Sequence, residues 1–114
     1  MRAVGLYEYL PIADESSLQD VELAKPEATG RDLLIAVKAI SVNPVDTKVR
    51  APKEGIEPTP RVLGWDAAGT VVSVGEAVTQ FEVGNDVYYA GDITRPGTNS
   101  EFHLVDERIV GRKP

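Results

Sequence analysis

Short apolar stretches, separated by glycine and proline, follow one another along most of this chain. The stretch from Leu33 to Val42 is almost continuously apolar, which predicts a strand buried on both faces for part of its length. If residues 86–90 form a strand, Tyr88 and Tyr89 point to opposite faces, so one of them is expected in the core. Several short strands at this spacing favour a β-barrel or a β-sandwich. The pattern predicts strands at residues 3–9, 18–23, 33–42, 70–74, 86–90 and 102–105, and a shorter one at 109–110.

One segment, residues 43–50, departs from the strand pattern and predicts a short helix. Asn43 is a favourable N-cap residue, and Pro44 suits the first helical position. Asp46 falls in the first turn, where the helix dipole favours an anion. The stretch 51–61 that follows is polar and rich in proline, so we expect a loop there.

Composition narrows the possible classes of protein. A chain of 114 residues, with 42% hydrophobic and 26% charged residues, suggests one globular domain. It has no cysteine, which excludes disulfides, thiolate zinc sites and a cysteine nucleophile. The net charge of −6 argues against nucleic acid as a partner. No apolar run approaches the length of a membrane span, and the N-terminus lacks the apolar core of a signal peptide, so we expect a cytoplasmic protein without a membrane partner.

Searches for catalytic motifs find little. There is no glycine-rich loop of the dinucleotide or Walker type, and therefore no phosphate cradle in this sequence. The one histidine, His103, lies in a predicted strand without a second candidate ligand nearby, so we expect a surface or half-buried residue rather than a metal ligand. The adjacent carboxylates at 14–15 and at Asp106–Glu107 are interpreted as solvated charge.

The spacing of the glycines is the most informative feature. Gly64-Trp65-Asp66-Ala67-Ala68-Gly69 is followed by the predicted strand, by Gly75 and then by Gly84. Taken alone, this spacing is compatible with any β-barrel that has tight turns. It also resembles the medium-chain dehydrogenase/reductase superfamily, whose N-terminal domain has a GroES-like β-barrel fold.

The resemblance extends over essentially the whole chain. Segments 42–46, 63–69 and 88–91 are similar to bacterial zinc-type alcohol dehydrogenase-like proteins of the quinone oxidoreductase branch. It implies a mainly β, GroES-like β-barrel over residues 1–114, with one or two short helices and without the nucleotide-binding domain. We therefore expect a fragment of a longer two-domain enzyme, inactive by itself.

Departures from the family pattern concern zinc. Where zinc-dependent relatives have a catalytic-site cysteine, histidine and glutamate, this chain has Asn43, Trp65 and Asp66. The cysteine-rich lobe of those relatives corresponds to residues 91–100, which contain no cysteine. Amide, indole and carboxylate do not form a tetrahedral zinc site, so we expect no metal. A zinc-dependent alcohol dehydrogenase, a GroES-like binding module without catalysis, and a domain that docks on another chain remain alternatives.

The resemblance also implies site residues. It places the short helix beside the nicotinamide of NADPH, with Asn43 and Asp46 as catalytic residues, and with Lys48 and Trp65 in the same cleft. The alternatives are a simple N-cap for Asn43, helix-dipole complementarity or pairing with Lys48 or Arg50 for Asp46, and core filling for Trp65. The implied reaction is reduction of a quinone, an enone or a small carbonyl compound by hydride transfer. A homodimer is expected through the face that would contact the missing domain.

Overall fold

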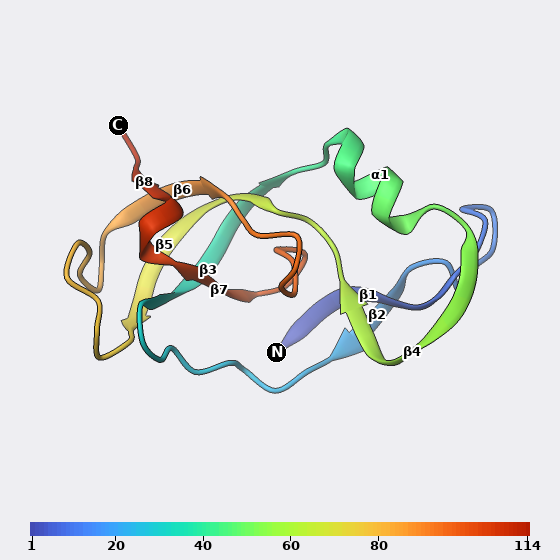
Figure 1. The fold of residues 1–114 in the computed structure, drawn as a ribbon, viewed down its shortest axis with the longest axis horizontal. Coiled ribbons are helices and arrows are strands. Elements are labelled where there is room, and N and C mark those ends of the chain that lie inside the picture. Colours follow the sequence, from blue (N-terminus) through green and yellow to red (C-terminus); the bar gives the residue numbers. More distant parts are fainter.

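The computed structural model describes all 114 residues and confirms the mainly β architecture (Figure 1). Both the strand pattern and the short helix are confirmed, with most boundaries within a few residues of the prediction. The last strand begins at Val110, directly after a short 3-10 helix. None of the helices has the length and hydrophobicity that a membrane span requires. In chain order the elements are β1 (Arg2–Tyr9), β2 (Gln19–Glu22), β3 (Asp32–Ser41), α1 (Pro44–Arg50), β4 (Lys53–Val62), β5 (Asp66–Val74), β6 (Asp86–Ala90), β7 (Phe102–Asp106), η1 (Glu107–Ile109) and β8 (Val110–Arg112).

A five-stranded antiparallel sheet, in the order β7-β3-β5-β6-β8, forms one half of the molecule. Its two edge strands, β7 and β8, are joined only by the three-residue helix η1, so the sheet curls until its edges approach each other (Figure 1). This curvature gives the barrel character expected from the sequence. The main core fills the sheet's concave side and consists of Leu33, Ile35, Ala67, Val71, Phe81, Val87, Tyr89 and Val105.

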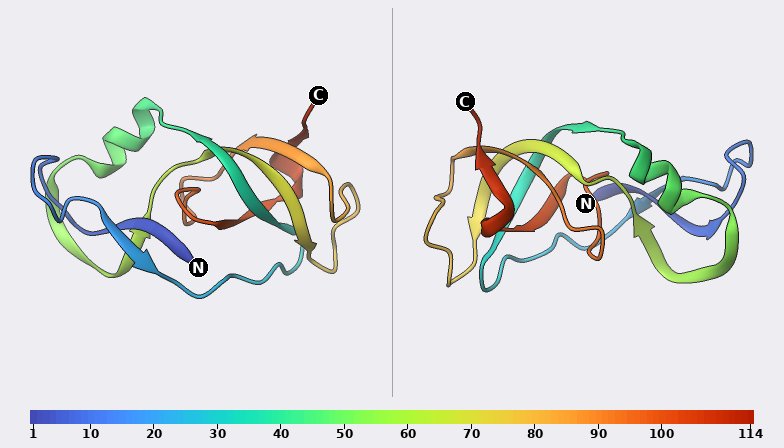
Figure 2. Two further views of the ribbon diagram at one scale, coloured as in Figure 1. Left: turned by 180° about the vertical axis from the view of Figure 1, so that it is seen from behind. Right: turned by 45° about the horizontal axis from the view of Figure 1, so that its top comes forward.

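A three-stranded antiparallel sheet, in the order β2-β1-β4, forms the other half, and helix α1 lies at the same end of the molecule (Figure 2). The helix packs through Val45 and Val49 against a second, smaller core. Four buried side chains make up that core: Leu6, Tyr9, Leu63 and Trp65. The helix is therefore held in place by apolar contacts beside the three-stranded sheet.

Two predictions about strand faces are confirmed. In β3, Leu33, Leu34 and Ile35 are all buried, whereas residues 38–41 are exposed. In β6, Tyr89 is buried in the main core, and Tyr88 is 51% exposed on the opposite face. Burial on both faces is thus confined to the part of β3 that lies between β5 and β7.

The loop predicted for residues 51–61 is wrong, because Lys53–Val62 form strand β4. This strand pairs with β1 alone and lies at the edge of its sheet. The register between the two strands shifts twice, so the pairing is irregular. Proline is tolerated at such an edge because a free N–H group is not needed on the open side. Pro58 and Pro60 are therefore compatible with a strand that the sequence pattern did not reveal.

The interpretation of Asp106–Glu107 as solvated charge is wrong for Glu107, which is completely buried. Glu107 Oε1 accepts hydrogen bonds from the backbone N–H groups of Thr79, at 3.1 Å, and Gln80, at 2.8 Å. Arg31 Nη1 lies 3.7 Å from the other carboxylate oxygen. Burial of the charge is tolerated because these donors replace its hydration. Glu107 thereby ties the 75–81 segment to the end of β7.

Candidate functional site

The start of helix α1 carries the two predicted catalytic residues. Asn43 is the N-cap, as predicted, and its backbone N–H donates to Asp46 Oδ2 at 2.7 Å. Asp46 is buried, and its other oxygen, Oδ1, has no hydrogen-bond partner. The carboxylate does not pair with Lys48 or Arg50, since Arg50 donates instead to the carbonyl of Leu10 at 2.9 Å. Asp46 therefore keeps a buried acceptor atom that the protein itself leaves unpaired.

The side chain of Asn43 turns toward the start of β5. Its amide nitrogen donates to Asp66 Oδ2. Because an ionised carboxylate only accepts, this contact fixes which end of the amide faces Asp66. In the sequence, Asp66 is identifiable only as the replacement of a glutamate, and nothing there links it to Asn43. The two residues are far apart in the chain, and only the antiparallel pairing of Ser41 with Asp66 brings them together.

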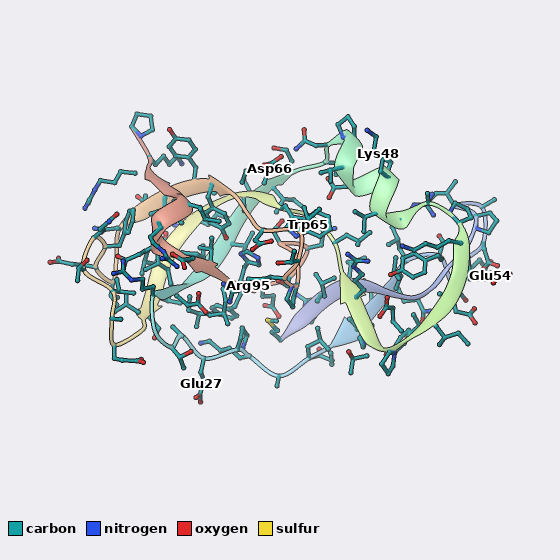
Figure 3. All side chains as sticks on the ribbon, in the orientation of Figure 1. Glu27, Lys48, Glu54, Trp65, Asp66 and Arg95 are labelled. Atoms are coloured by element: carbon teal, nitrogen blue, oxygen red, sulfur yellow. The ribbon has the colours of Figure 1, made fainter.

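The other two predicted cleft residues lie in different surroundings. Lys48 is exposed on α1 and forms no ion pair or hydrogen bond, whereas Trp65 lies in the middle of the molecule (Figure 3). Trp65 is 3% exposed and packs in the smaller core, which is the core-filling role left open for it. Its indole Nε1 donates to the carbonyl of Arg95 at 3.4 Å. The structure thus brings Asn43, Asp46 and Asp66 together, with Trp65 directly before Asp66 in the chain.

A shallow groove of about 580 Å³ adjoins this cluster. Ser41 and Asp66 form its polar end, and the outer faces of β3, β5 and β6 form its floor. Most of the lining is apolar and includes Ala68, the cross-strand partner of the exposed Tyr88. The site therefore combines a polar end with an adjoining apolar surface.

The only histidine is not available as a metal ligand. The prediction of a surface or half-buried residue is wrong, since His103 is 4% exposed inside the five-stranded sheet. Nε2 donates to the carbonyl of Pro96 at 3.0 Å, so Nδ1 accepts from the Tyr89 hydroxyl at 2.7 Å. Burial lowers the pKa of His103 to about 4 and raises the pKa of Tyr89.

The remaining donor atoms do not form a metal site either. No group of three or more His, Cys, Asp or Glu side chains converges anywhere in the structure. The two carboxylates near Asn43 lack the nitrogen and sulfur ligands that zinc prefers. The residues present therefore do not fit a zinc ion.

Comparison with known families decides the assignment. The alcohol dehydrogenase GroES-like domain matches residues 29–114, which is most of the chain. The chain belongs to this family. The resemblance to the medium-chain dehydrogenase/reductase superfamily is thereby confirmed.

Individual relatives cover the whole chain. A zinc-type alcohol dehydrogenase-like protein of Staphylococcus aureus is 41% identical over 114 residues, which are 100% of this chain and 33% of that protein. A protein from Rhizobium etli CFN 42, provisionally named a zinc-dependent alcohol dehydrogenase, matches with a TM-score of 0.94 and 58% identity over 100% of this chain and 33% of that one. The quinone oxidoreductase from Coxiella burnetii matches with a TM-score of 0.87 and 26% identity over 100% of this chain and 37% of that one. The chain thus spans about a third of the length of these relatives.

Proposed function

We propose that this chain is the catalytic-domain part of a zinc-independent, NADPH-dependent oxidoreductase that reduces a quinone, an enone or a small carbonyl compound. The observation that carries the proposal is the family match over residues 29–114, in a chain whose site lacks zinc ligands. Relatives with names of both the alcohol dehydrogenase and the quinone oxidoreductase type support the same reaction class. The preference for NADPH over NADH follows from the resemblance to the quinone oxidoreductase branch alone.

Asn43 is the residue we propose to contact the reacting groups. Its amide has two N–H groups, of which Asp66 accepts one, so the second can donate to an oxygen of the substrate or cofactor. Hydride transfer to a carbonyl carbon leaves negative charge on the oxygen, and a fixed N–H donor stabilises that charge. The bound nicotinamide would supply the hydride. Asp66 holds the amide in one orientation, so little reorganisation is needed during the reaction.

Asp46 and the two remaining predicted residues have supporting roles in this proposal. Asp46 is buried, and its Oδ2 accepts the backbone N–H of Asn43 at 2.7 Å, so its proposed role is to hold Asn43 in place at the cleft. Lys48, exposed on the same helix, can approach an anionic group at the rim of the cleft. Trp65 would form the apolar wall behind Asp66. The adjoining apolar groove favours a substrate with an apolar body and one polar end.

The experiment compares two proteins: the 114-residue chain, and a longer protein in which a dinucleotide-binding domain follows this chain. We expect NADPH oxidation by a quinone or enone only for the longer protein, and no saturable NADPH binding by the chain alone at micromolar cofactor. We expect the longer protein to keep its activity after dialysis against a chelator and to contain no zinc by elemental analysis. Activity that is lost with the metal would instead establish a zinc-dependent alcohol dehydrogenase. A stable heptamer without reductase activity would favour a GroES-like binding module.

A further inference from the structure

The short segment Val62–Trp65, which leads into β5, is hydrogen-bonded along its whole length by the loop of residues 91–101 between β6 and β7. All four consecutive backbone carbonyls of this segment accept a backbone N–H group from the loop. In the order Val62, Leu63, Gly64 and Trp65, the donors are Gly97 (2.9 Å), Asn99 (3.0 Å), Thr98 (2.6 Å) and Gly91 (2.6 Å). The position of Trp65 therefore depends on where this loop is held.

Two glycines allow the loop and the segment to approach this closely. A Cβ atom at Gly97 would overlap the carbonyl oxygen of Gly64. Gly64 itself has φ of +91°, and a Cβ there would lie 2.5 Å from Asn99 Oδ1. Side chains at either position would push the two backbones apart. The contact is thus specified by the sequence on both sides.

One ion pair fixes the middle of the loop to the five-stranded sheet. Arg95 donates through Nη1 and Nη2 to the two oxygens of Asp32, at 2.9 and 2.8 Å. Both side chains are partly shielded from solvent, with 33% of Arg95 and 18% of Asp32 exposed. A bidentate pair of this kind constrains orientation as well as distance. The carbonyl of the same residue, Arg95, accepts the indole N–H of Trp65.

A short chain of contacts links the pair to the candidate site. Asp32 holds Arg95, and the Arg95 carbonyl holds the indole ring of Trp65. Trp65 directly precedes Asp66, which orients the amide of Asn43. A second hydrogen bond, from His103 Nε2 to the adjacent Pro96 carbonyl, supports the same turn of the loop.

We propose that Arg95 and Asp32 are positioning residues, which set the orientation of the Trp65 indole and thereby the start of β5 at the candidate site. The catalytic importance of this arrangement rests on the proposed function, whereas the arrangement itself does not. Without the pair, residue 95 is no longer fixed to Asp32, so its backbone carbonyl can move away from the indole N–H that it accepts at 3.4 Å.

The test uses the fluorescence of the 114-residue chain, in which Trp65 is the only tryptophan. For Arg95→Met we expect a red-shifted emission maximum and faster collisional quenching by acrylamide, with an unchanged far-ultraviolet circular dichroism spectrum. The matched control is Arg108→Met, which removes a similar pair with Asp106, at 2.7 and 3.0 Å, on the surface. We expect the control to keep the wild-type emission and quenching.

The outcomes separate the proposal from its alternatives. Arg95→Met with wild-type emission and quenching would overturn it. If Arg95→Met loses its β-sheet circular dichroism spectrum, Asp32→Asn is measured instead. This variant removes the negative charge of the pair and keeps the shape of the Asp32 side chain. The variant that carries both Arg95→Met and Asp32→Asn should shift the emission maximum no further than either change alone, because both changes break the same ion pair. None of these measurements needs cofactor or substrate, so failure of the proposed reductase activity would leave their result unaffected.

Discussion

Replacement of the buried carboxylate of Glu107 tests how the 75–81 segment is held. Glu107→Ala removes two hydrogen bonds from backbone N–H groups to a charged acceptor, at 3.1 and 2.8 Å. Such bonds contribute about 1.5–3 kcal/mol each, so the variant should lose roughly 3–6 kcal/mol of unfolding free energy. A domain of this size has on the order of 6–17 kcal/mol in total. The variant is therefore expected to fold weakly or to remain partly unfolded.

The conservative variant gives a graded result. In the wild type Oε1 accepts both N–H groups at the shorter distances, and Oε2 accepts the Thr79 N–H as well, at 3.4 Å. The amide oxygen of Glu107→Gln can keep both bonds without the charge, so we expect a loss of only about 1–2 kcal/mol. The matched control is Glu27→Ala, because Glu27 is exposed, makes no ion pair and points outward (Figure 3). Its effect should stay within about 0.5 kcal/mol.

Urea unfolding followed by Trp65 fluorescence measures the free energy of unfolding of the wild type and of the three variants. Hydrogen exchange at the amides of Thr79 and Gln80 adds a local readout, since these N–H groups should exchange faster in Glu107→Ala than in the wild type. The expected order of stability is wild type and Glu27→Ala, then Glu107→Gln, then Glu107→Ala. An alanine variant as stable as the Glu27 control would refute the role assigned to Glu107.

Three further predictions concern pH, packing and catalysis. Burial lowers the pKa of His103 from its ordinary 6.5 to about 4 in the folded chain. Between pH 6.5 and pH 4 the unfolded chain therefore binds a proton that the folded chain does not. The free energy of unfolding should fall by roughly 3 kcal/mol as the pH drops from 6.5 to 4. Urea midpoints measured across this range should show the fall, and His103→Gln should flatten it. Gly69→Ala should cost about 1–3 kcal/mol in urea unfolding, because its Cβ would overlap the Ala36 carbonyl oxygen. In the longer, cofactor-binding protein, Asn43→Ala should lower kcat about 100-fold, because it removes the side-chain amide proposed to stabilise the developing oxyanion. An unchanged kcat would argue against that role.

Local signals explain why much of the fold could be predicted. Helix α1 was predicted because Asn43, Pro44 and Asp46 favour a helix start through contacts within a few residues. The strands of the main core were predicted because each is a short apolar stretch bounded by turn residues. Strand β4 was missed because its prolines resemble a loop, and only its place at a sheet edge makes them acceptable.

The parts of the site that could not be predicted depend on partners that are distant in sequence. His103 is neutral and buried because the Tyr89 hydroxyl and the Pro96 carbonyl both reach it. Asp66 meets Asn43 only because β3 and β5 pair in one particular register. The order of residues along the chain does not show which side chains become hydrogen-bond partners in the folded structure. Family resemblance directed attention to helix α1, but the contacts around it required the three-dimensional structure.

The placement of β3 between β5 and β7 has a consequence for synthesis on the ribosome. Strand β5 follows β3 closely in the chain, but β7 lies near the other end. Ala3 likewise meets Ser100, so this one contact of β1 forms only after the 91–101 loop has emerged. At translation rates of about 5–20 residues per second, the apolar flank of β3 stays unpaired for several seconds after it emerges. Folding of the nascent chain is therefore gated by its last strands, and this interval is when chaperones would be most needed.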